Sequence, residues 1–189
     1  SLLYRVEWGV SGPQPYERSQ RAAHDLRPIS ITPGYNANAL GSALVSWGNT
    51  VVLATVTVEN KTAPHLRNVC GADGWLTAEY ALLPGSTPTR VRRERPAPSG
   101  RTQEIQRLIG RALRAVMDLQ PFRGKTITVD TDVLVADGGT RAAALLAGYA
   151  ALHDAANALV QNGTLSEWPL RTELAAVSAG LVDGAVLTD

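Results

Sequence analysis

The spacing of apolar residues divides the chain into an irregular beginning and a long region of regular elements. Residues 1–20 mix proline, glycine and polar side chains without a sustained period, which predicts an N-terminal arm. Residues 21–189 carry alternating and helical patterns, so we expect them to form a single domain. Extended segments are predicted over residues 26–35, 42–49, 50–60 and 74–83.

The third of these segments has the pattern of a central strand. Gly48-Asn49, which precedes it, is suited to a hairpin turn, so the second and third segments should pair. Val52, Ala54 and Val56 fall on one face and are all apolar, whereas the opposite face is mixed. We therefore expect this strand in the middle of a sheet.

Two α-helices are predicted in the second half of the chain. After Ser99 the apolar residues step by three and four, as on one face of a helix, and Ser99 or Thr102 can cap its start. The apolar positions are Ile105, Leu108, Ile109, Ala112, Leu113 and Val116. Residues 125–136 alternate as a strand, residues 140–160 form a second, largely buried helix rich in alanine and leucine, and residues 173–182 form a final strand. This order of elements predicts an α+β domain.

Positive charge is concentrated in one part of this pattern. Residues 90–114 contain eight arginines and two glutamates, whereas the net charge of the whole protein is only +1. Arginine stays charged and holds phosphate through its planar guanidinium group, so this excess indicates a polyanionic partner. Residues 84–99 contain four prolines and four arginines, which predicts an exposed basic loop.

The residues from Gly138 to Arg141 form a candidate anion-binding turn. A strand, a glycine pair and a hydroxyl residue opening a buried helix leave unpaired backbone amides that fit an oxyanion. Thr140 can donate its hydroxyl group, and Arg141 can neutralise charge. Taken alone, such a motif is more often a routine turn in which Thr140 caps the helix and Arg141 faces solvent.

Arginines of the basic region are further candidates. Arg101 lies near the start of the first helix and could converge on the same anion if both helix starts face one edge of the sheet. Arg90, Arg92 and Arg93 are candidates for RNA binding or subunit contacts, and the alternative is a solvated basic loop.

The sequence gives little support for a metal site, a serine or cysteine nucleophile, or a common nucleotide-binding motif. Asp130 and Asp132 share a strand face and could bind a divalent cation, but two acids on an exposed face need no metal. The three histidines neighbour no serine or cysteine nucleophile in a known motif, and the common nucleotide and zinc motifs are missing. With one cysteine, no long apolar run and no signal-peptide pattern, we expect a cytoplasmic protein without a membrane partner.

Five segments together carry a resemblance to a known family. They are DLRPISI at 25–31, GWLTAEYALLP at 74–84, SGRTQEIQRLIGRALRAVMDL at 99–119, TITVDTDVLVADGGTRAA at 126–143 and AAVSAGLVDG at 175–184. This ordered set resembles the ribonuclease PH family of phosphate-dependent 3′ exoribonucleases, which trim tRNA precursors. The resemblance implies a ribosomal-protein-S5-domain-2-like βαβα fold, here without the family's C-terminal strands and closing helix.

The resemblance also implies a reaction and its residues. In this family inorganic phosphate attacks the terminal phosphodiester of RNA and releases a nucleoside diphosphate. Arg101, Gly139, Thr140 and Arg141 match the family's phosphate site, and Arg101 is expected to be catalytic. Asp189 matches the first of two aspartates, six residues apart, that serve metal binding, expected as Mg²⁺ or Mn²⁺, and proton donation to the leaving oxygen.

We therefore expect a phosphorolytic 3′→5′ exoribonuclease, a nucleotidyltransferase that acts on tRNA precursors and other RNA 3′ ends such as those of rRNA. By resemblance its assembly is a homo-hexamer, a trimer of dimers. One alternative is a non-catalytic RNA-binding subunit of an exosome-like ring, and a weaker one is a phosphate-binding metabolic enzyme. Inactive relatives commonly lose the phosphate-site arginines, which this chain keeps.

Overall fold

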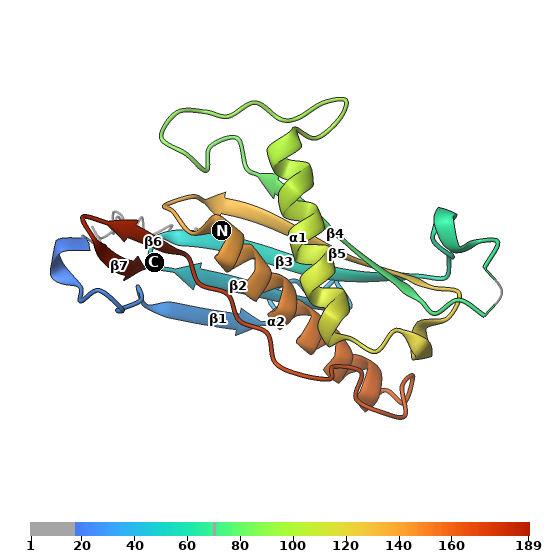
Figure 1. Cartoon of the computed structure of the whole chain (residues 1–189). Coiled ribbons are helices and arrows are strands. Elements are labelled where there is room, and N and C mark those ends of the chain that lie inside the picture. Colours follow the sequence, from blue (N-terminus) through green and yellow to red (C-terminus); the bar gives the residue numbers. More distant parts are fainter. Residues whose placement is uncertain (1–17, 70) are drawn as a thin grey trace, which may run out of the picture.

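The domain is a mixed five-stranded sheet with two α-helices on one face (Figure 1). The computed structural model describes residues 18–69 and 71–189, so most of the predicted N-terminal arm lies outside the described residues. In sheet order the strands are β1 (Ile29–Pro33), β2 (Gly41–Trp47), β3 (Thr50–Glu59), β5 (Thr126–Val135) and β4 (Trp75–Leu82). The remaining main elements are α1 (Gly100–Val116), α2 (Thr140–Gln161) and a hairpin of β6 (Ala179–Val182) and β7 (Ala185–Thr188).

Strand β3 is central in the sheet, as predicted. It pairs with β2 through the predicted two-residue turn, where Gly48 has a φ of +58° and Trp47 pairs with Thr50. Its apolar residues Val52 and Ala54 are fully buried against α2. Burial of this face stabilises the fold, because each buried methyl or methylene group adds favourable transfer free energy.

Strands β4 and β5 are the parallel pair of the sheet, and α1 connects them. Each helix follows the carboxyl end of one of these strands, so the first turns of α1 and α2 lie toward the same end of the sheet (Figure 1). Helix α1 buries Ile105, Ile109 and Leu113, as predicted. Leu108 is 39% exposed and was wrongly placed in the core, because it lies at the border of the apolar stripe.

Helix α2 is the central helix of the core. Among the described helices it is long and apolar enough to cross a membrane by composition, yet most of it is buried against β2, β3 and β5. Gly41 in β2 permits this close approach, because a Cβ atom there would overlap the backbone of Ala155. The alanine-rich sequence of α2 thus serves packing of the helix directly on the sheet.

The segment after α2 differs from the prediction. The strand expected over residues 173–182 begins only at Ala179, and it turns at Asp183-Gly184 into β7. Before Ala179 the chain runs across α2 on the helix side of the sheet (Figure 1), where it has no neighbouring strand to pair with. The hairpin is tied to the start of the described chain by Thr188 N, which donates to Ala23 O at 2.9 Å.

Candidate active site

The turn before α2 is built from two consecutive glycines in the left-handed region. Gly138 has a φ of +81° and Gly139 a φ of +67°, which other residues rarely adopt. Gly139 is the N-cap residue and supplies no side-chain cap, so the first-turn amides of α2 have no intrahelical acceptor. These amides and the positive end of the helix dipole favour an anion. The geometry therefore agrees with the predicted anion-binding turn.

Thr140 and Arg141 are held by neighbours from β4 and α1. The buried Tyr80 hydroxyl donates to Thr140 Oγ1 at 3.1 Å. Arg141 Nη2 donates to Glu104 Oε2 at 2.7 Å, and both side chains are about half exposed. Glu104 follows Arg101 by three residues and so shares its side of α1. This ion pair joins the N-terminal part of α1 to the first turn of α2, and Arg101 is exposed in the first turn of α1.

The start of α1 is capped, unlike that of α2. Ser99 Oγ accepts from Thr102 N at 3.3 Å. The Glu94 carboxylate accepts from Ser99 N at 2.9 Å and from Thr102 Oγ1 at 3.0 Å. Hydrogen bonds from Ser99, followed by the one from Thr102, hold the pKa of Glu94 below its usual value. Because Glu94 already lies at the start of α1, the start of α2 is the more open position for an added anion.

Asp189 lies behind the same turn, between two arginines. Its Oδ1 accepts from Arg27 Nη2 at 2.6 Å, and its Oδ2 accepts from Arg27 N at 2.7 Å and Arg21 Nη1 at 3.1 Å. The carboxylate is 2% exposed. Burial raises the pKa of Asp189, but the hydrogen bonds from Arg27 outweigh it and lower the pKa to about 2. Such a carboxylate is ionised at neutral pH and holds no proton to donate.

A divalent metal does not fit the residues around Asp189 as they are arranged. Arginine donors engage both carboxylate oxygens, and the described part of the chain contains no group of three or more histidine, cysteine or acidic residues that could hold a metal ion. Asp130 and Asp132 belong to no such group either, and burial raises the pKa of both. The metal-binding and catalytic roles of Asp189 stay predictions.

The basic loop forms a cleft with β4 and the start of α1. The cleft has a volume of about 390 Å³. Its lining includes Glu79, Tyr80, Arg92, Arg93, Thr102 and Gln106. Arg90, Arg92 and Arg93 are all exposed. Burial raises the pKa of Asp132, and the nearby positive charge of Arg93 partly offsets this rise. These three arginines are accessible to a polyanion, and their predicted role in RNA binding or ring assembly is untested.

Arg27, Thr50 and Tyr80 are residues of the site that sequence reasoning missed. Arg27 Nη1 donates to Asp137 O at 2.6 Å, and Thr50 Oγ1 donates to Gly138 O at 2.6 Å. Thr50 immediately follows the predicted hairpin turn, and Arg27 belongs to a segment that carries the family resemblance. These sequence features do not predict that Thr50 and Arg27 contact the turn before α2, which lies 88 residues from Thr50 and 110 residues from Arg27. The contact depends on the order of the strands in the sheet.

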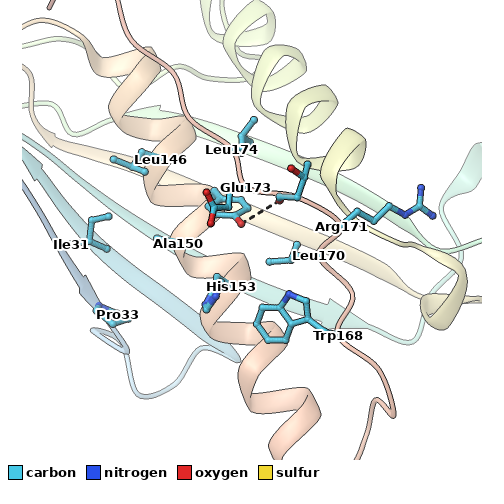
Figure 2. A pocket seen from close by; sticks show the side chains of 12 residues that line it. Ile31, Pro33, Leu146, Ala150, His153, Trp168, Leu170, Arg171, Glu173 and Leu174 are labelled. Atoms are coloured by element: carbon cyan, nitrogen blue, oxygen red, sulfur yellow. Dashed lines mark hydrogen bonds between the residues drawn. The ribbon is translucent and has the colours of Figure 1, made fainter.

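A larger groove lies away from this turn, along α2. It has a volume of about 610 Å³ and lies between β1, α2 and residues 168–174 (Figure 2). Ile31, Leu146 and Leu170 contribute apolar surface, and His153 contacts the edge of Trp168 with ring centroids 4.8 Å apart. The groove is mostly apolar and contains none of the predicted phosphate-site residues, so it is not the candidate active site.

Comparison with known proteins gives consistent results for sequence and fold. Residues 25–157 match the model of the 3′ exoribonuclease family, domain 1. The chain is 52% identical over 172 residues to the ribonuclease PH of Deinococcus radiodurans, covering 91% of this chain and 69% of that protein. It is 49% identical over 176 residues to the ribonuclease PH of Neisseria meningitidis, covering 92% of this chain and 72% of that protein.

Solved structures with the same fold include an archaeal exosome and rice Rrp46. An Archaeoglobus fulgidus exosome with RNA bound to the active site matches with a TM-score of 0.73 and 25% identity, over 91% of this chain and 69% of that one. Rice Rrp46 matches with a TM-score of 0.67 and 22% identity, over 92% and 72%. The matched family model and the identity to the bacterial enzymes establish that the chain belongs to the ribonuclease PH family of 3′ exoribonucleases.

Proposed function

We propose that this chain is a phosphorolytic 3′→5′ exoribonuclease that trims tRNA precursors, with inorganic phosphate bound at the start of α2. The observation that supports this site most directly is the turn of Gly138 and Gly139, which opens a helix without a side-chain cap and is followed by Thr140 and Arg141. The chain is also about half identical to ribonuclease PH proteins over most of its length.

The proposed site addresses the main physical difficulty of the reaction. A phosphate dianion must approach an anionic phosphodiester, so fixed positive donors are needed to offset repulsion and to hold the attack in line. Arg141 and the amides at the start of α2 would hold the phosphate, and Arg101 from α1 would supply a second guanidinium group. On binding phosphate, Arg141 would release its half-exposed partner Glu104. This costs little free energy, because exposed ion pairs contribute little to stability.

The exposed basic loop is the proposed contact for RNA. The matched Archaeoglobus structure carries RNA at its active site. In this chain Arg92 and Arg93 line the cleft beside the start of α1, and Arg90 is exposed in the same loop. A homo-hexameric ring, a Mg²⁺ or Mn²⁺ requirement and a cytoplasmic location are expectations from the resemblance and composition. Arginine donors engage both carboxylate oxygens of Asp189, so a metal bound there would have to displace these hydrogen bonds.

Replacing Arg92 by alanine is expected to weaken RNA binding and to reduce its salt dependence by about one unit of slope, because one phosphate contact is lost. The phosphate requirement should change little. Binding of a fluorescent tRNA 3′ fragment across a salt series measures both quantities. Arg67→Ala, an exposed arginine far from the cleft, is the matched control and should leave the slope unchanged. Equal slopes in all three proteins would contradict this placement of RNA.

The alternative of a non-catalytic ring subunit has less support. The likeness to rice Rrp46 is a likeness of fold, and the chain keeps Arg101, Thr140 and Arg141 at the proposed phosphate site. Phosphate-dependent release of nucleotides by the isolated chain would exclude this alternative, and co-purification with an active homologue would favour it.

A further inference from the structure

Arg27 is a buried arginine that links three segments at the proposed phosphate site. Its side chain is 6% exposed. The guanidinium group donates to Asp137 O at 2.6 Å, to Gly138 O at 3.4 Å and to Asp189 Oδ1 at 2.6 Å. Because Asp189 neutralises its charge, Arg27 is poorly suited to attract an anion itself. Its contacts are instead with the backbone that precedes α2.

These contacts determine which way the peptide groups of the turn face. In a trans peptide the C=O of one residue and the N–H of the next point in opposite directions. Arg27 holds the carbonyl of Asp137 on the core side, and Thr50 Oγ1 with Arg27 holds the carbonyl of Gly138 there. The amides of Gly138 and Gly139 must therefore face away from Arg27, toward the open side of the turn.

Gly139 is required for the same arrangement. A Cβ atom at this position would lie 3.0 Å from Arg27 Nη2, and the φ of +67° is itself unfavourable for other residues. Glycine thus permits both the backbone conformation and the close approach of the guanidinium group. The glycine pair and the buried arginine form one unit.

We propose that Arg27 is a positioning residue that orients the amides of the Gly138-Gly139 turn toward inorganic phosphate, through its hydrogen bonds to the carbonyls behind them. The proposal rests on the proposed phosphate site at the start of α2. It assigns Arg27 a role distinct from that of Arg141, which contacts the phosphate directly. Loss of Arg27 should therefore weaken phosphate binding and leave RNA affinity unchanged.

The test compares the parent chain with Arg27→Lys and Arg27→Ala. Lysine keeps the positive charge beside Asp189 but lacks the planar fork that reaches two carbonyls. Isothermal calorimetry with inorganic phosphate measures binding without relying on activity, and steady-state kinetics separate KM for phosphate from KM for RNA. Arg123→Lys, an exposed arginine paired with Asp73 at the other end of β4 and β5, is the matched control.

Arg27→Lys should bind phosphate about 10- to 100-fold more weakly, as expected for lost hydrogen bonds from a charged donor. Its KM for RNA should be unchanged, and added methylguanidinium should partly restore phosphate binding to Arg27→Ala. If Arg27 only stabilised the fold, its substitution would not raise KM for phosphate while leaving KM for RNA unchanged. Methylguanidinium would then not restore phosphate binding to Arg27→Ala. Unchanged phosphate affinity in folded Arg27→Lys would overturn the proposal.

A second variant covers the case in which substitutions of Arg27 do not fold. Thr50→Val removes the other hydrogen bond to Gly138 O, and also the one that Thr50 Oγ1 accepts from Asp137 N, with little change of shape. It should therefore also weaken phosphate binding, and unchanged affinity would contradict the proposal. A parent chain that binds phosphate without releasing nucleoside diphosphates would contradict the proposed function alone. A parent chain that binds no phosphate would contradict both.

Discussion

Replacing Arg141 by alanine is expected to reduce kcat/KM for phosphate about 100- to 1000-fold, the usual effect of deleting one preorganised donor to a transition-state anion. The fold should survive, because within the described residues Arg141 forms a single ion pair, its half-exposed contact with Glu104, and such exposed pairs contribute little to stability. Phosphate-dependence curves of nucleotide release, combined with thermal melting, measure the two effects separately.

Arg171→Ala is the matched control for this experiment. Arg171 also forms an exposed ion pair, with Asp118 at 3.0 Å, but it lies beside the apolar groove along α2. Its removal should leave the phosphate dependence unchanged. If Arg141→Ala and Arg171→Ala behaved alike, Arg141 would not be a phosphate ligand.

The second large effect is expected for Asp189→Asn, which should lower the free energy of unfolding at pH 7 by about 3 kcal/mol, because two arginines at a buried site lose their ionised partner. The pH dependence follows from the pKa of Asp189, which is about 2 in the folded protein and thus below the ordinary aspartate value of 3.8. A lowered pKa stabilises the folded state above pH 3.8 and this contribution is lost as the pH falls toward 2. It amounts to about 2 kcal/mol.

Urea denaturation of parent and variant between pH 7 and pH 2.5 tests this prediction. The parent should lose more stability than Asp189→Asn over the acid part of this range, so the two curves should converge. Asp118→Asn is the control, since the exposed pair with Arg171 should contribute less than about 1 kcal/mol. An Asp189→Asn variant as stable as the parent at pH 7 would show that the Arg27 and Arg21 contacts contribute nothing to the fold.

These contacts change the interpretation of Asp189. The family resemblance predicts a metal ligand or proton donor at this position. In the structure the carboxylate is buried and engaged by Arg27 and Arg21, and it lies directly behind Gly139. These contacts hold Arg27 in place, and Arg27 in turn donates to the carbonyl groups of Asp137 and Gly138 in the turn before α2. The expected metal and proton roles require these hydrogen bonds to be released.

Those parts of the site whose residues are adjacent in the sequence could be predicted from local sequence patterns. The glycine pair, the hydroxyl residue and Arg141 adjoin one another, so their strand-to-helix turn could be predicted from composition and periodicity. The cap of α1 by Ser99 was predictable for the same reason.

The long-range parts were not accessible from one sequence. Arg27, Thr50 and Asp189 meet behind Gly139 only because the ends of β1, β3, β5 and β7 come together, and no period along the chain encodes that meeting. The strand predicted from residue 173 failed on similar grounds. Its residues have strand-like character, but they run across a helix where no strand edge is available.

The most direct test of phosphorolysis is the product of RNA degradation with and without phosphate. A tRNA precursor labelled in its last nucleotide is incubated with the chain, and the released nucleotides are resolved chromatographically. We predict nucleoside diphosphates that appear only when inorganic phosphate is present. Release of nucleoside monophosphates without phosphate, or RNA left intact in its presence, would contradict the proposed function.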